Sequence, residues 1–290
     1  MAFTELKAGG VPEHFNLPWH LATEKKSFEN NNFSIRWKDY PSGTGAMCAD
    51  LRSGELDIAV LLTEGILSDI LKGNPSKIIQ WYVTSPLVWG IHVPAQSDFQ
   101  TIEEVKGKRY AISRFGSGSH LMAYVDAKMR GWKLKEEQFI KVNNLDGAID
   151  AFKNNKADIF MWEKFMTKPL VDAGLFRRID ERPTPWPCFV IAASDRALSM
   201  YKNEIQKMQE IINESCQDLM HAANAVPIIA SRYSLQENDV QQWFSATKWS
   251  TGNTVEASTL ESVMDTLLEL KLVDRKISPS EICSGLCGLR

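Results

Sequence analysis

Two short segments rich in glycine and hydroxyl residues stand where a predicted strand gives way to a helix. Gly43-Thr44-Gly45 precedes one helix, and Gly116-Ser117-Gly118-Ser119 precedes another. The N–H groups at a helix N-terminus carry partial positive charge and attract anions, and glycine lets the backbone approach a ligand. The segments therefore predict a cradle for a phosphate, sulfonate or carboxylate group. The alternative is a plain N-cap followed by a flexible turn.

Acidic and aromatic side chains follow two predicted strands of similar sequence. Thr63 and Glu64 follow one strand, and Trp162 and Glu163 follow the other. A tryptophan ring stacks on flat ligands and carboxylates accept N–H donors, so this combination suits an aminopyrimidine or a similar heteroaromatic molecule. For any single tryptophan, packing in the core is the alternative.

The remaining candidates lie in the first strand-to-helix loop, in the second glycine segment and near two predicted chain crossings. Trp243 and Trp249 are assigned to the core. We expect no catalytic residue. The predicted ligand-binding set is Glu13, His14, Phe15, Thr44, Thr63, Glu64, Trp89, Arg114, Gly116, Ser117, Gly118, Ser119, Trp162, Glu163 and Trp186.

Motifs for nucleophilic or nucleotide chemistry are missing from the second glycine segment. Its serines lack the glycine spacing of a G-x-S-x-G elbow, and Leu121 breaks the G-x-G-x-x-G pattern. Ser117 or Ser119 beside His120 resembles a nucleophile and base, but adjacent residues at a helix start point apart. We therefore expect a binding site without a cofactor.

Metal ligands and disulfides are not indicated either. His14 and His20 are six residues apart, which is not the i, i+4 spacing of a helical metal pair. Five widely spaced cysteines do not resemble a disulfide framework, and two thiols, Cys283 and Cys287, make a weak zinc site alone. We expect no metal; whether Cys283 and Cys287 pair stays open.

The scaffold that positions these residues alternates strands with helices, twice over. Such a pattern predicts an α/β fold with mostly parallel sheets and helices on both faces. The expected strands are 3–9, 33–37, 56–62, 77–83, 109–113, 138–142, 157–162 and 176–180, and the expected helices are 18–28, 43–53, 64–72, 120–130, 146–153 and 164–173. From residue 196 onward the chain reads as mainly helical, over 196–223, 227–233, 237–244 and 254–270.

An internal repeat suggests two similar lobes. ADLRSGELDIAV (49–60) matches DAFKNNKADIFM (150–161), which places Asp57 and Asp158 101 residues apart. A strand, glycine loop and helix start recur at nearly the same offset. Residues 84–94 and 186–194 read as crossings between lobes. We therefore predict lobe one over 1–88 and 190–290, with the helical C-terminal part, and lobe two over 89–189.

Four stretches together resemble the type-2 periplasmic solute-binding proteins: GGVPEHFNLPWHLA, SGTGAM with DLRSGELDIAVLLTEG, RFGSGSH and NNKADIFMWEKF. The similar branch serves ABC importers of nitrate, sulfonates, taurine and thiamine-pyrimidine precursors, and the likeness covers about residues 5–225. It implies two Rossmann-like lobes, a hinge and a ligand in the cleft between them. A related branch synthesises the thiamine pyrimidine, but its cluster of consecutive cysteines does not occur here.

The composition and the N-terminal sequence limit the classes of partner and the location that we expect. The 290 residues carry 33 basic and 36 acidic side chains, which leaves no basic footprint for nucleic acid or an anionic membrane. The N-terminus lacks a basic region followed by an apolar one. We therefore expect a cytoplasmic protein, or a periplasmic one with an ABC permease as partner if a leader has been removed.

Three functions follow from these patterns. The first is a protein that closes two lobes over a small anionic or heteroaromatic ligand, for uptake or sensing. The second is an enzyme of the thiamine-pyrimidine type on the same fold. The third is an intracellular protein that keeps the fold but binds a partner or a regulatory ligand.

Overall fold

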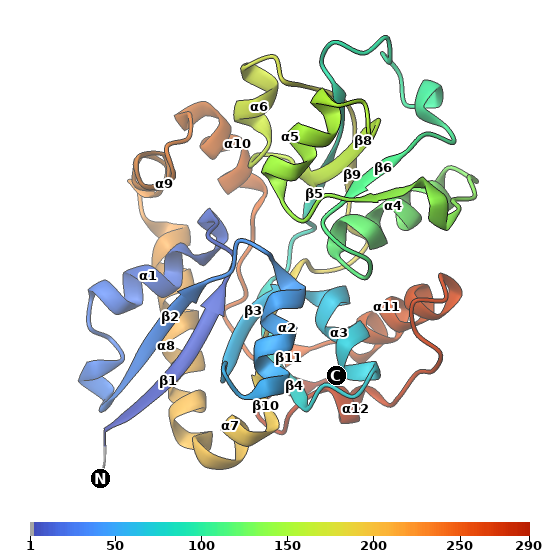
Figure 1. Ribbon diagram of the computed structural model, residues 1–290. Coiled ribbons are helices and arrows are strands. Elements are labelled where there is room, and N and C mark those ends of the chain that lie inside the picture. The colour runs from blue at the N-terminus through green and yellow to red at the C-terminus, as the bar shows by residue number, and fades with distance from the viewer. Residues whose placement is uncertain (1–2) are drawn as a thin grey trace. The chain divides into compact units, whose positions relative to one another are not determined.

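The computed structural model describes residues 3–290, which divide into two compact units. Unit 1 comprises the residues up to Ser85 together with Trp186–Arg290, and unit 2 comprises Pro86–Pro185 (Figure 1). Each unit has its own five-stranded sheet.

The unit 1 sheet has the strand order β2-β1-β3-β10-β4. Strand β1 pairs in parallel with β2 and β3, whereas β10 is antiparallel to both of its neighbours. Strands β3 and β10 are continuously apolar and buried, as expected for central strands covered on both faces. The bounds are β1 (Thr4–Gly10), β2 (Phe33–Asp39), β3 (Ile58–Leu62), β4 (Ser76–Val83) and β10 (Phe189–Ser194).

Helices on both faces complete unit 1. Figure 1 shows α2 on one face of the sheet and α8 on the other. Helix α2 ends at Gly54, whose φ of +78° suits glycine at a helix terminus. The unit contains α1 (Leu17–Glu24), α2 (Thr44–Ser53), α3 (Thr63–Leu71), α7 (Asp195–Met200), α8 (Lys202–His221), α9 (Ala225–Tyr233), α10 (Glu237–Ala246), α11 (Ala257–Glu269), α12 (Pro279–Ile282) and the short strands β11 (Thr254–Val255) and β12 (Gly288–Leu289).

Unit 2 is built on the strand order β7-β6-β8-β5-β9. Its core gathers Phe152, Phe160 and Phe176 with several alanines from α5 and the sheet. Its elements are β5 (Val88–Pro94), β6 (Tyr110–Ile112), α4 (Gly118–Met129), β7 (Phe139–Lys141), α5 (Leu145–Lys153), β8 (Ile159–Glu163), α6 (Lys168–Asp172) and β9 (Phe176–Pro183).

The two sheets have the same topology, which confirms the predicted repeat. Strands β1, β2, β3, β10 and β4 correspond in order to β6, β7, β8, β5 and β9. The repeated aspartates make the same contact. Oδ2 of Asp57 accepts the Lys7 backbone N–H at 3.0 Å, and Oδ2 of Asp158 accepts the Arg109 backbone N–H at 2.9 Å.

Several predicted elements differ from the structure. The sheets are mixed rather than mostly parallel, because the two predicted crossings contain β5 and β10, the antiparallel strands beside the centre of each sheet. The predicted helix over 196–223 is interrupted at Tyr201, whose ψ of 33° is not helical. The helices predicted over 164–173 and 254–270 begin later, at Lys168 and Ala257.

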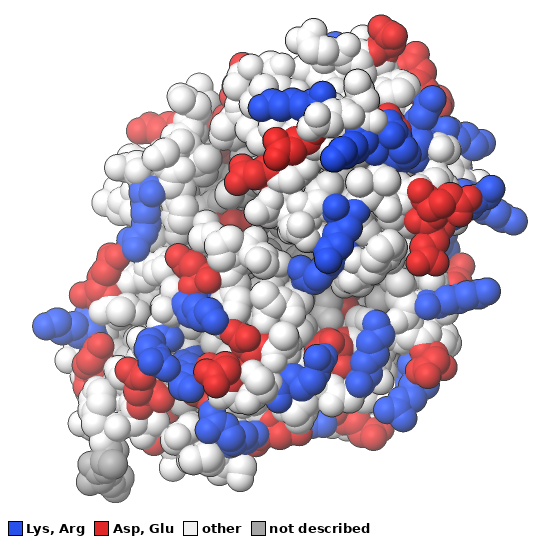
Figure 2. Space-filling model, viewed as in Figure 1, with Lys and Arg blue, Asp and Glu red and all other residues white. Residues whose placement is uncertain are grey.

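Surface charge agrees with the balanced composition. On the face shown in Figure 2, acidic and basic side chains are interspersed over both units. Among residues 3–290, no helix has the length and apolar character needed to cross a bilayer.

Candidate functional site

Most of the predicted ligand-binding residues lie at strand ends or in the loops that follow them. Unit 1 carries Glu13, His14, Phe15, Thr44, Thr63, Glu64 and Trp186, and unit 2 carries Trp89, Arg114, Gly116–Ser119, Trp162 and Glu163. The carboxyl ends of strands are where open α/β sheets bind ligands.

His14 is the most deeply buried titratable residue in the loop after β1. It begins the 3-10 helix η1 (His14–Asn16), and its ring centroid lies 3.9 Å from that of Trp243 and 6.0 Å from that of Tyr233. Burial lowers the pKa of His14 to about 3, so the ring is neutral at physiological pH. A neutral imidazole offers one N–H donor and one acceptor.

Unsatisfied polar atoms gather around this ring. Neither ring nitrogen of His14 has a hydrogen-bond partner within the described chain, and the same is true of Asn16 Oδ1, Trp243 Nε1 and Tyr233 Oη. We call His14, Asn16, Tyr233 and Trp243 the His14 cluster. A buried polar group without a partner costs about 1–3 kcal/mol, so several together indicate groups that meet a ligand or ordered water.

Phe15 holds this loop in place rather than leaving it mobile. Its carbonyl oxygen accepts hydrogen bonds from Tyr82 Oη at 2.8 Å and Trp249 Nε1 at 2.9 Å. Gly10, just before the loop, leaves room for Asn16, since a Cβ there would lie 2.5 Å from the Asn16 Nδ2. Trp249 is therefore a core residue, as predicted.

Two carboxyl groups of unit 1 are protonated more readily than usual. Burial raises the pKa of Glu13 to about 7. Burial also raises the pKa of Glu64 to about 7, although its hydrogen bonds, including one from Trp186, act in the opposite direction. Glu64 Oε1 has no partner among the described residues. At neutral pH both carboxyls can donate as well as accept.

The two threonines predicted for the site are tied to the unit 1 backbone. Thr44 Oγ1 accepts the Leu62 N–H at 3.2 Å, and Thr63 Oγ1 donates to the Pro187 carbonyl at 2.6 Å. Both residues are buried. These contacts fix the first turns of α2 and α3 against β3 and the segment before β10.

The second glycine segment makes a closed network of its own. Ser117 Oγ accepts the His120 N–H and lies 3.1 Å from Ser119 Oγ, which in turn accepts the Ser113 N–H. The Gly116 N–H donates to His120 Nδ1 at 3.0 Å. Ser117 thus caps α4, and the predicted contact of this segment with a ligand stays a prediction. Through its Nδ1, His120 helps to order the loop.

The end of β8 carries the acidic and aromatic residues of unit 2. Glu163 Oε2 accepts the Phe165 and Met166 N–H groups at 2.8 and 2.7 Å, which shapes the turn before α6. The Trp162 ring is half-buried and stacks on Phe160 at 5.3 Å. Trp89 pairs with Glu163 across the strands, and its buried Nε1 has no partner in the described part of the chain.

Sequence reasoning missed two members of the His14 cluster. Trp243 is buried, as predicted, but its N–H is unpaired beside His14 rather than used in the core. Tyr233 and Trp243 come from α9 and α10, far from the first loop in sequence, and no local pattern links them.

Within residues 3–290, no three His, Cys, Asp or Glu side chains gather to hold a metal.

Comparison with known proteins supports the predicted fold and resemblance. A family model described as Ca3427-like PBP matches residues 89–182. The chain is also similar to the Candida albicans CA3427 gene product, with a TM-score of 0.87 and 28% identity over 94% of this chain and 92% of that one. That protein is described as having the generic periplasmic binding protein fold. The chain therefore has the periplasmic binding protein fold, and about a third of its length matches the Ca3427-like family model.

Other solved structures share the fold at lower identity. The alkanesulfonate-binding protein SsuA from Xanthomonas axonopodis pv. citri, bound to MOPS, has a TM-score of 0.78 and 18% identity, covering 99% of both chains. The nitrate-binding protein NrtA from Synechocystis PCC 6803 has a TM-score of 0.69 and 13% identity over 93% of this chain and 82% of that one. No curated protein sequence matches significantly. The predicted fold class is confirmed, and the comparisons support the predicted resemblance to the type-2 periplasmic binding proteins.

Proposed function

We propose that this protein binds one small anionic or heteroaromatic molecule without transforming it. The observation that carries the proposal is the His14 cluster. Five of its buried polar atoms have no hydrogen-bond partner among residues 3–290, and His14 lies in the loop after β1, where an α/β fold suits a ligand. A ligand that pairs with them removes the cost of leaving them unsatisfied.

The chemistry of the cluster favours a polar ring. Neutral His14 supplies a donor and an acceptor, Trp243 supplies an N–H donor, and Tyr233 supplies a hydroxyl group. The aromatic faces suit stacking on a heteroaromatic molecule. A thiamine-pyrimidine precursor satisfies these requirements. In unit 2, Arg114 and the N-terminus of α4 favour an anionic group.

We propose that the two units close over the ligand by a hinge motion. Two structurally similar proteins are named as binding alkanesulfonate and nitrate, which supports a small polar solute as the ligand. The biological setting would be uptake, with an ABC permease as partner if the chain is exported, or sensing inside the cell. Both settings require the same binding step.

The test is a thermal-shift screen with four probes: taurine, nitrate, MOPS and 4-amino-5-hydroxymethyl-2-methylpyrimidine. A ligand that binds only the folded state raises Tm by mass action. The proposal expects a saturable rise with at least one probe. No rise with any probe at millimolar concentration argues against small-solute binding of this class.

Two tryptophan variants locate the binding. Trp243→Phe keeps the ring but removes the unpaired N–H, so we expect it to fold normally and to lose most of the ligand-dependent Tm rise. Trp81→Phe is the matched control, because its buried ring donates its N–H to Glu256 rather than to the loop that holds His14. We expect that variant to lose about 1 kcal/mol of stability and to keep the ligand-dependent rise. Equal rises in the wild type and Trp243→Phe would contradict the assignment of the His14 cluster.

A further inference from the structure

Unit 2 contains a cavity that none of the predicted ligand-binding residues lines. Its volume is about 430 Å³, a size typical of small-molecule sites. It is bordered by Asp158 and Leu175. Asp158 immediately precedes β8, and Leu175 immediately precedes β9. Trp162 and Glu163 lie at the other end of β8. The cavity is therefore distinct from the site proposed above.

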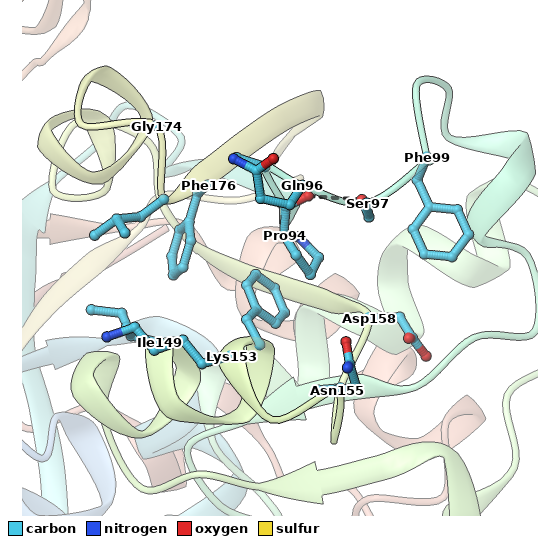
Figure 3. A pocket seen from close by; sticks show the side chains of 14 residues that line it. Pro94, Gln96, Ser97, Phe99, Ile149, Lys153, Asn155, Asp158, Gly174 and Phe176 are labelled. Atoms are coloured by element: carbon cyan, nitrogen blue, oxygen red, sulfur yellow. Dashed lines mark hydrogen bonds between the residues drawn. The ribbon is translucent and has the colours of Figure 1, made fainter.

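The cavity is lined mostly by apolar residues, and its polar lining residues are Gln96, Ser97, Lys153, Asn155 and Asp158. The rings of Phe152 and Phe176 pack edge to face with centroids 5.0 Å apart, and both side chains are buried. Figure 3 shows Ile149 and Lys153 on the helix that forms one wall, with Phe176 and Phe99 at opposite ends of the opening. The apolar part of a ligand that enters the cavity would leave water and gain contacts with aromatic and aliphatic side chains.

The loop that forms one rim is held in a fixed shape by Arg177. The guanidinium group donates to the backbone carbonyls of Ala95 at 2.7 Å, Ser97 at 3.0 Å and Phe99 at 2.9 Å. The Ala95 N–H also donates to the Leu175 carbonyl. Because the loop is ordered before a ligand arrives, binding requires little further loss of conformational freedom.

The charge at the rim is positive. Asp158 is already neutralised, since both its carboxylate oxygens bind the Arg109 guanidinium at 2.9 Å. Lys153, exposed at the last turn of α5, has no ion pair or hydrogen bond among the described residues. An anionic head group at the rim would therefore meet a cation that has no competing carboxylate partner.

We propose that this cavity binds a small amphipathic monoanion, an alkyl or aryl carboxylate. Its apolar body packs against Phe152 and Phe176, and its carboxylate lies beside Lys153 at the rim. The site belongs to unit 2 alone and does not depend on the ligand of the His14 cluster.

The experiment uses the fluorescence of 8-anilinonaphthalene-1-sulfonate, with octanoate and octanol as competitors. The proposal expects saturable fluorescence enhancement and displacement by octanoate. Ile149→Trp places a larger side chain in the cavity from α5. We expect it to weaken the apparent affinities for the dye and for octanoate by about tenfold, because the ligand then loses apolar contact surface. Unchanged octanoate displacement in this variant would overturn the proposal, as would the absence of saturable binding in the wild type.

Charge recognition is tested by variants of an exposed residue, which should not disturb folding. Lys153→Gln is expected to weaken octanoate by about two- to fivefold while leaving octanol unchanged, as an exposed charge pair predicts. Lys153→Glu should weaken octanoate further. Lys156→Gln, a change at an exposed lysine that does not line the cavity, should leave both competitors unchanged. Equal effects of Lys153→Gln and Lys156→Gln would contradict a carboxylate position beside Lys153.

Discussion

The indole Nε1 of Trp186 donates a 2.8 Å hydrogen bond to Oε2 of Glu64. The bond joins the start of α3 to the segment just before β10, and both side chains are buried. Because Glu64 Oε1 has no partner within the described chain, the carboxyl group gains little from being charged. Its protonation is therefore linked to folding.

Glu64 should make stability fall as pH rises. Its pKa is about 7 in the folded protein, against an ordinary value of 4.5, so the folded state binds the proton more tightly. The favourable contribution is complete below about pH 4.5 and is lost as pH approaches 7. Glu64→Gln keeps an acceptor for Trp186 and cannot titrate. We expect its stability relative to wild type to increase across this window, by up to about 1.4 kcal/mol per pH unit.

Urea unfolding from pH 4 to pH 8 measures this difference directly. Glu261→Gln, on the exposed surface of α11, is the matched control and should show a nearly constant offset. A constant offset for Glu64→Gln as well would contradict the linkage.

His14 should act with the opposite sign. Its folded pKa is about 3 against an ordinary 6.5, so the unfolded state takes up the proton first. The stability that His14 contributes by staying neutral is present above about pH 6.5 and is lost as pH falls toward 3. We expect His14→Gln to lessen acid destabilisation over this range, measured by the same unfolding series. His221→Gln, at an exposed histidine, is the control, and similar curves for both variants would count against the prediction.

Gly147 should not tolerate alanine. Replacing glycine in a helix normally stabilises it by about 1 kcal/mol. Here, however, a Cβ would lie 1.8 Å from the Val142 carbonyl oxygen, which is backbone and cannot rotate away. We expect Gly147→Ala to destabilise the protein by about 1–3 kcal/mol. Gly252→Ala, where a Cβ meets nothing within 4 Å, should change stability by less than about 0.5 kcal/mol. Equal midpoints in urea for the two variants would refute this expectation.

Cys287 should be the most reactive thiol of the native protein. A hydrogen bond from the Cys283 thiol lowers its pKa, whereas the same contact raises the pKa of Cys283. Burial raises the pKa of Cys216. With limiting iodoacetamide, peptide mass spectrometry should find Cys287 alkylated first and Cys216 last. Preferential alkylation of Cys216 before unfolding would be inconsistent with this order.

Much of the fold could be predicted because its signals are local. The Asp57 and Asp158 segments carry the same helix end, turn and strand start, and both carboxylates make the same backbone contact. Strand direction was harder to predict. Nothing in the apolar run of β10 indicates whether it enters the sheet parallel or antiparallel, since both choices bury the same side chains.

The candidate site was predictable only in part for a similar reason. The loop holding His14 was recognisable from its position after a strand. Trp243 and Tyr233 reach that loop through the packing of α9 and α10, which no spacing rule describes. The Thr63 hydroxyl donates to the Pro187 carbonyl, a contact between distant parts of the sequence that no local pattern indicates. Ligand contact by the other residues of the predicted set remains a prediction.

The position of β10 in the unit 1 sheet has a consequence for the order of folding during synthesis. Strand β4 is an edge strand whose sheet neighbour is β10, yet all of unit 2 lies between them in the chain. Unit 2 is thus the first to have its whole sequence available, although it is inserted in the other unit. Until β10 emerges from the ribosome, the apolar β4 has no partner in its sheet and is exposed to pairing with other nascent chains.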